Sequence, residues 1–183
     1  QQGQFNVSNQ VQFPYIPQIR ELNESHVVVN RLNNIILQFP SSIDTSIAST
    51  RNIDVEVLAT SSEKSGRKTG RVYVQPFYNW TNADFPEKYI PVSAIYRGSF
   101  KSFYKGKQPA PEATQSPETR ILVVGSAYFM LDQITQRAQE NLTFFANIVD
   151  YLSDDSGLIQ IRSKNVSTPQ LEEVESGTKK MIK

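Results

Sequence analysis

Apolar residues follow two patterns along the chain, and both are patterns of β-strands. At 53–58 and 90–96 they occupy alternate positions, which is typical of a strand with one buried face. At 35–39 they form a short run with the length of a buried strand, and at 121–124 a continuous run like those of strands buried on both faces of a parallel sheet. The patterns therefore predict a sheet at the centre of the fold, with 121–124 as a central parallel strand.

A helical pattern follows the last of these runs. Across 138–152 apolar residues recur at intervals of four, three, four and three, which places them on one face of an amphipathic helix. This face consists of Ala138, Leu142, Phe145, Val149 and Leu152. The run GLIQI at 157–161 has the length of one more strand, so 120–162 predicts a strand, a crossover helix and a parallel strand with a right-handed connection. Phe145 is expected to lie in the core beneath this helix.

These elements predict a single three-layered α/β domain with a mainly parallel sheet over residues 13–165. The polar stretch 1–12 is expected to fray. Residues 105–119 contain three prolines and few apolar residues, which predicts a mobile loop within the domain. Residues 166–183 are expected to form a polar tail that leads towards a membrane anchor outside this sequence.

Composition and charge narrow the classes of function. The 183 residues include 19 basic and 18 acidic side chains, so the formal net charge of +1 creates no overall field to attract nucleic acid or anionic lipid. No apolar run approaches the roughly 20 residues of a membrane-spanning helix. The chain has no cysteine, which excludes disulfides, thiolate catalysis and sulfur-ligated metals. No spacing of metal ligands appears either, so we expect no metal and no cofactor.

Two predicted strands end in loops that are rich in hydroxyl groups, within IILQFPSSIDTS and VEVLATSSEKSG. Ser and Asp side chains often bond nearby backbone amides in turns, and this is the first role that we expect here. If 35–39 and 55–58 are neighbouring parallel strands, both loops lie at the carboxyl edge of the sheet, where ligands of open α/β sheets bind. The candidate ligand or partner surface then consists of Ser41, Ser42, Asp44, Thr60, Ser61 and Ser62.

Catalysis and nucleic-acid binding are two further interpretations. His26 is the only histidine, so a serine hydrolase would have to combine it with a loop serine and Asp44, which the spacing does not favour. At 97–107, RGSFKSFYKGK interleaves aromatic and basic residues as binders of single-stranded nucleic acid do, although aromatic residues at this spacing also pack in cores. The residue inventory thus favours a binding or structural module over an enzyme, without a nucleic-acid partner.

Five stretches taken in order resemble the GldG-like auxiliary components of gliding-motility-type ABC transporters. They are LQFPSSIDTS, VEVLATSS, AIYRGSFKSFY, RILVVGSAYF and NLTFFANIVDYLSDDSGLIQIRSK. The resemblance covers roughly residues 14–164, and the last stretch is its most specific part. It implies a glutamine-amidotransferase-like or flavodoxin-like sheet, but the chain lacks the cysteine of such enzymes, so no catalytic residue is carried over.

The resemblance also implies a place and a set of partners. The domain is expected at the periplasmic, extracytoplasmic face of the bacterial inner membrane, attached only through flanking transmembrane helices of a longer parent protein. Its partners would be the permease and ATPase subunits, and its role non-catalytic binding or complex assembly. The alternatives are an independent glycan- or peptide-binding module of the cell envelope and, third, a serine hydrolase.

Overall fold

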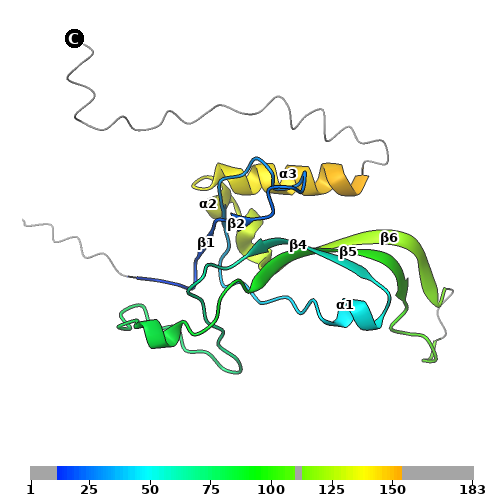
Figure 1. Ribbon diagram of the computed structural model, residues 1–183, viewed down its shortest axis with the longest axis horizontal. Helices are drawn as coiled ribbons and strands as arrows, with labels where there is room; N and C mark the ends of the chain where they lie inside the picture. The colour runs from blue at the N-terminus through cyan, green and yellow to red at the C-terminus, as the bar shows by residue number, and fades with distance from the viewer. Residues whose placement is uncertain (1–11, 110–112, 154–183) are drawn as a thin grey trace, which may run out of the picture.

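The computed structural model describes residues 12–109 and 113–153, and its main element is a four-stranded sheet (Figure 1). The strand order is β2-β4-β5-β6, and every neighbouring pair is antiparallel. The strands are β2 (Glu21–Leu22), β4 (Asp54–Thr60), β5 (Pro91–Lys101) and β6 (Gln115–Val124). A separate two-stranded antiparallel sheet pairs β1 (Gln18–Ile19) with β3 (Ile35–Ile36).

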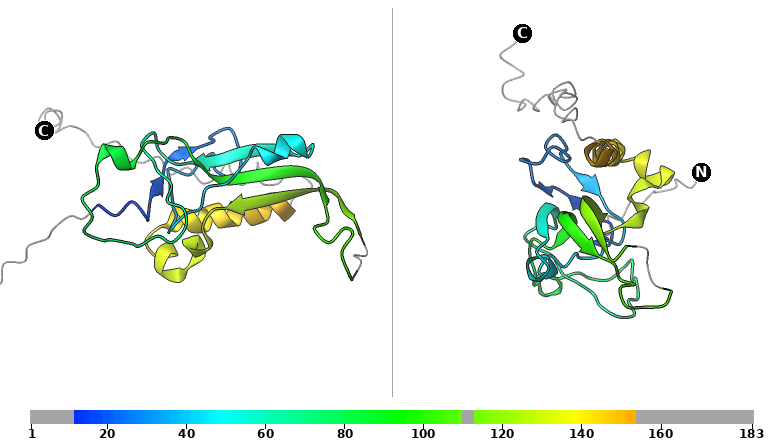
Figure 2. Two further views of the ribbon diagram at one scale, coloured as in Figure 1. Left: turned by 90° about the horizontal axis from the view of Figure 1, so that it is seen from below. Right: turned by 90° about the vertical axis from the view of Figure 1, so that its right-hand side faces the viewer.

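Helices lie on both sides of the larger sheet (Figures 1 and 2). The longest, α3, lies on one side, and the single turn α1 lies on the other. Short helices follow β4 and β6 in the chain. The helices are α1 (Ile47–Thr50), η1 (Asn82–Asp84), η2 (Ala127–Met130), α2 (Asp132–Thr135) and α3 (Gln139–Ser153). Within the described ranges, no helix has the length and apolar character to cross a membrane.

The prediction of a mainly parallel, three-layered sheet of the glutamine-amidotransferase-like or flavodoxin-like kind was wrong. β5 and β6 form a hairpin through 102–114, and the connection from β4 to β5 carries only the three-residue η1. Parallel neighbours require a crossover, usually a helix, whereas antiparallel neighbours require none. β6 also begins at Gln115, inside the segment that was expected to be a loop.

Among the described strands β6 lies at the edge of the sheet and pairs antiparallel with β5, so the prediction of a central parallel strand at 121–124 was wrong as well. Leu122 and Val124 pack against the core, while Ile121 and Val123 are 42% and 37% exposed. A short apolar run does not by itself distinguish a strand buried on both faces from an edge strand with one solvent face. The second strand of the predicted crossover, at 157–161, lies outside the described residues.

The predicted helix is confirmed as α3, but its predicted buried face was wrong. Asn141, Phe144 and Ile148 are buried, whereas Phe145 is 41% exposed. The chain carries two apolar stripes at helical spacing on adjacent faces, and the buried one contains a polar residue, Asn141. Periodicity therefore selected the uninterrupted stripe, which is the more exposed one.

The core lies between α3 and the sheet and is filled by the segment that leads into β3. Val28, Ile35 and Leu37 are fully buried there with Phe144. At the far end of β6, the peptide N–H of Ser41 donates to the carbonyl of Gly125 at 2.7 Å. A Cβ at Gly125 would collide with the carbonyl oxygen of Ser41, so only glycine lets these two backbones approach so closely.

Candidate functional site

The two hydroxyl-rich loops meet at one end of the larger sheet, although not through the predicted parallel pairing. β3 belongs to the smaller sheet and is no neighbour of β4, so that condition was wrong. Ile43 N–H donates to the carbonyl of Pro91 at 2.9 Å, and Ser61 N–H donates to the carbonyl of Ile90 at 2.8 Å. Both loops are therefore held against the beginning of β5.

Three polar side chains of these loops make hydrogen bonds within the protein, and those of Asp44 and Ser62 are local. A carboxylate oxygen of Asp44 accepts from the backbone N–H of Ser46 at 2.9 Å and from its hydroxyl at 2.7 Å, and these bonds lower the pKa of Asp44. The Ser61 hydroxyl accepts from the N–H of Ile90 at 2.8 Å, and the Ser62 hydroxyl donates to the carbonyl of Lys64 at 3.0 Å. The bonds of Asp44 and Ser62 are those of turn residues, whereas the bond of Ser61 joins its loop to the residue before β5.

The other members of the predicted surface differ in exposure. Ser41 and Ser42 are exposed, and Thr60 is half-buried at the end of β4. The loops thus present a few hydroxyl groups to solvent beside an ordered backbone. A role for this surface in binding a ligand or partner stays a prediction.

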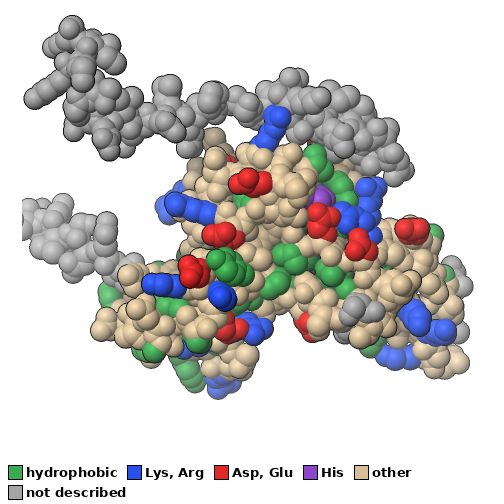
Figure 3. Space-filling view, in the orientation of Figure 1, with side chains coloured by type: hydrophobic (Ala, Val, Ile, Leu, Met, Phe, Trp, Pro, Cys, Tyr) green, Lys and Arg blue, Asp and Glu red, His purple; other side chains and the backbone are tan. Residues whose placement is uncertain are grey.

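His26 is buried between α3 and the sheet, and its surroundings do not form a hydrolase triad. Its Nδ1 accepts from the N–H of Val28 at 3.2 Å, and its ring packs edge-on against Tyr151 with centroids 5.0 Å apart. Its Nε2 lies 3.5 Å from the guanidinium of Arg97, which pairs with Glu56 at 2.7 Å. Ser41, Ser42 and Ser61 are not among the side-chain hydrogen-bond partners of His26 in the described structure. A small part of the histidine side chain, purple in Figure 3, is visible at the surface beside acidic and basic side chains.

Burial lowers the pKa of His26, and the nearby charges of Glu56 and Arg97 act in opposite directions. Protonation would also place an N–H at Nδ1 against the N–H of Val28. Since the pKa in the folded state lies below the ordinary 6.5, the unfolded state binds the proton first as pH falls. The free energy of unfolding should be highest above the ordinary pKa and should decrease between about pH 7 and about pH 5.

Urea unfolding across this pH range measures the effect, with His26→Gln as the control. Glutamine keeps an acceptor but does not titrate, so the slope of stability against pH should flatten in the variant. The carboxylates with lowered pKa values, Asp44, Asp84 and Glu87, have ordinary values of 3.8, 3.8 and 4.5 and titrate below the range. If the free energy of unfolding depends on pH as steeply in His26→Gln as in the parent chain, another group causes the loss of stability.

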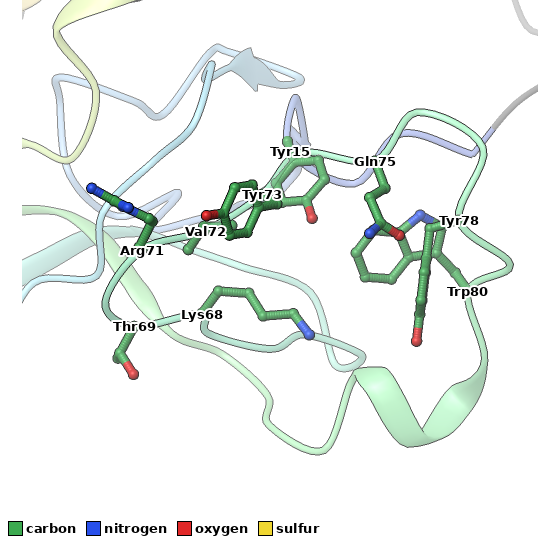
Figure 4. Close-up of a pocket in the computed structure, with 9 residues that line it drawn as sticks. All are labelled: Tyr15, Lys68, Thr69, Arg71, Val72, Tyr73, Gln75, Tyr78 and Trp80. Carbon is green, nitrogen blue, oxygen red and sulfur yellow. The ribbon is translucent and has the colours of Figure 1, made fainter.

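A hollow of about 290 Å³ lies in the loop region between β4 and β5 (Figure 4). Tyr15, from the segment before β1, supplies one wall, and residues 68–80 supply the rest. Figure 4 shows Tyr15 and Tyr73 on one side, Tyr78 and Trp80 at one end, and the ammonium of Lys68 directed towards Trp80. No site was predicted there from the sequence.

Aromatic contacts and one carboxylate hold the end wall in place. The ring of Trp80 packs against Tyr15 and Tyr78 with centroids 5.5 Å and 4.7 Å away, and against Phe85 at 5.6 Å. The carboxylate of Asp84 accepts from the hydroxyl of Tyr78 at 3.1 Å and also caps the start of η1. A single loop carboxylate therefore fixes both an aromatic wall and the turn that carries it.

The hollow combines aromatic faces with positive charge. Lys68 Nζ lies 5.9 Å from the centre of the Trp80 ring, within the range of a cation–π contact. Arg71 is a second basic residue of the lining, and no acidic residue or histidine contributes to it. Trp80 Nε1 is buried and has no hydrogen-bond partner in the described structure. Buried indole N–H groups usually find an acceptor, so this donor is an exception.

A compositional signal for this site was present in the sequence. Four aromatic residues occur within 73–80, directly after the basic positions of 67–71. The same combination was noted at 97–107, where Phe103 and Tyr104 are 76% and 59% exposed near the tip of the β5–β6 hairpin. There Lys107 Nζ lies 3.3 Å from the Phe103 ring centre. What the pattern could not show was Tyr15, which comes from a distant part of the chain.

No group of three or more His, Cys, Asp or Glu side chains in the described ranges is arranged to hold a metal ion.

Comparison with known proteins places the chain in a family. Neither the comparison with curated proteins nor that with solved structures gave a match. The model of a family described as ABC-type uncharacterized transport system matches residues 1–154. Since this covers most of the 183 residues, the chain belongs to this family of ABC transporter auxiliary components.

Proposed function

We propose that the chain is a non-catalytic domain of an ABC transporter auxiliary protein and that it acts by binding. Membership of the family supports the link to a transport system. The resemblance to GldG-like proteins supports the finer parts of the proposal, which are a gliding-motility-type transporter, the extracytoplasmic face of the inner membrane, and permease and ATPase subunits as partners.

The observation that carries the binding role is the chemistry of the aromatic hollow. Its walls offer ring faces, a cation and amide and hydroxyl groups, which suit recognition of a ligand. They include neither carboxylate nor imidazole, the groups that most often serve as general acid or base. The single histidine lies in the core contact between α3 and the sheet, where it faces Val28 and Arg97. These features support binding over hydrolysis.

Purification of a tagged parent protein from membranes of the source cells tests the proposed association. We expect an ABC permease and its ATPase to be recovered with it in constant proportion, and to be lost when residues 12–153 are deleted. A parent protein that purifies without either subunit under mild detergent conditions would contradict the proposal.

An activity assay tests the non-catalytic part. The purified chain should not hydrolyse ester, amide or glycoside substrates above the rate of a His26→Gln control. Turnover that disappears in this variant would establish the hydrolase interpretation instead.

A further inference from the structure

We propose that the hollow beside Trp80 binds an anionic sugar, which is a sugar ring that carries a carboxylate or a phosphate group. This inference deepens the binding role proposed above and rests on it. It is carried by three observations, which are the angles between the aromatic rings, the charge of the lining and the unpaired indole N–H.

Two aromatic rings of the hollow stand at steep angles to the ring of Trp80. Tyr78 and Tyr15 meet the plane of Trp80 at 67° and 72°. A flat nucleobase held between two side chains needs parallel rings, so Trp80 cannot form such a slot with Tyr15 or Tyr78. A sugar ring instead presents C–H groups on its faces and hydroxyl groups around its rim. Ring faces set at steep angles can contact those C–H groups from two sides, while Gln75 and Thr69 offer hydrogen bonds to the rim.

Charge selects an anionic form of the sugar. Figure 4 shows the Lys68 ammonium at the side of the hollow, directed towards Trp80. The nearby Arg67 is paired with Glu87 at 2.8 Å, so it is already engaged. Lys68 also lowers the pKa of Asp84, but less than do the hydrogen bonds from Thr81 to that carboxylate. Lys68 and Arg71 would repel a cationic ligand such as a methylated amine, and no acidic residue of the lining offsets their charge.

The indole N–H of Trp80 supplies a donor that the fold leaves without an acceptor. Figure 4 shows Gln75 and Tyr78 beside the indole, and both side chains are exposed. Tyr78 is held by Asp84, whereas rotation of the Gln75 side chain would open the N–H to a hydroxyl or carboxylate oxygen of a ligand. A buried unpaired donor destabilises the free state, so a ligand that pairs with it gains affinity.

Trp80 is the only tryptophan of the chain, so its fluorescence reports directly on this site. The full chain is titrated with glucuronate, glucose 6-phosphate, glucose, a mononucleotide, acetate and inorganic phosphate. We expect a saturable change with one or both anionic sugars, and binding of glucose weaker by about tenfold, the cost of one charge-assisted hydrogen bond. The two anionic sugars distinguish a carboxylate from a phosphate ligand.

Two variants separate the hollow from the general charge of the loop. Lys68→Gln should weaken binding of the anionic sugar by about tenfold and remove its advantage over glucose. Lys64→Gln removes an equal charge from an exposed position of the same loop outside the lining, and it should leave the affinity unchanged. Tyr73→Ala should weaken binding of charged and neutral sugars alike.

Several results would overturn this inference. They are equal affinity for glucose and glucuronate, equal response to acetate or phosphate alone, tighter binding of a mononucleotide than of either anionic sugar, and no response to any sugar. Unchanged affinity of the Lys68→Gln variant for the anionic sugar would also overturn it. Recovery of the transporter subunits without a sugar response would reject the ligand class while leaving the proposed function in place.

Discussion

Replacing Phe144 with alanine should lower the free energy of unfolding by about 3–5 kcal/mol, the usual cost of truncating a buried aromatic side chain. Phe144 is fully buried, and its ring centre lies 5.9 Å from that of Phe129. The next residue provides a matched control, because Phe145 is 41% exposed. The same truncation there should cost less, about 1–2 kcal/mol, because the ring is partly exposed and meets Phe129 edge-on.

Chemical denaturation of both variants measures the difference. The midpoint should decrease strongly for Phe144→Ala and only slightly for Phe145→Ala, with similar dependence on denaturant in both. If the two losses are equal, or if Phe145→Ala is the costlier, then α3 packs on the face that its uninterrupted apolar periodicity indicated.

A comparable loss, of about 3–5 kcal/mol near neutral pH, should follow from Asn141→Asp. Asn141 is fully buried in α3, and its amide bonds both polar groups of one backbone residue in β3. Its Oδ1 accepts from Ile36 N–H at 2.9 Å, and its Nδ2 donates to the carbonyls of Ile36 and Phe129 at 2.8 Å and 2.9 Å. Aspartate has nearly the same shape but would turn an anionic oxygen towards two carbonyl oxygens.

The pH dependence of this variant separates charge from shape. Burial would raise the pKa of the introduced carboxyl group, so the loss relative to the parent chain should be largest at neutral pH and smaller at about pH 5. Asn147→Asp is the control on the same helix, since Asn147 is half-buried and its Nδ2 donates to the carbonyl of Val28 at 3.0 Å. Equal stability of Asn141→Asp and the parent chain would refute the role of the Asn141 amide as the hydrogen-bond partner of the Ile36 backbone.

The local patterns in the sequence identified the strands and the helix more reliably than they identified which elements pair or pack with one another. Alternation located β4 and β5, and the helical spacing located α3, because these periodicities depend only on neighbouring residues. The direction of strand pairing depends on connections, and an apolar run such as that of β6 fits either topology. The buried face of α3 was missed because Asn141, a polar residue, bonds the backbone of a strand 105 positions away.

In the candidate site, too, some features follow from local patterns and others depend on residues far apart in the sequence. The hydroxyl loops were expected to make turn bonds, and local rules are sufficient for Asp44 and Ser62 because their partners lie two residues away. The aromatic hollow depends on contact between Tyr15 and Trp80, which no local pattern specifies. Aromatic and basic residues close together in the sequence could indicate aromatic and charged contacts with a ligand, but not the hollow that they line.

The late position of α3 in the chain also affects when the domain can form during its synthesis. The β5–β6 hairpin pairs residues close in sequence and can form early. The core around Val28, Ile35 and Leu37, in contrast, is covered by Phe144 and Ile148. Because a chain leaves the ribosome from its N-terminus, this apolar surface stays uncovered until α3 has emerged. A nascent domain of this kind would therefore be a substrate for chaperones through most of its translation.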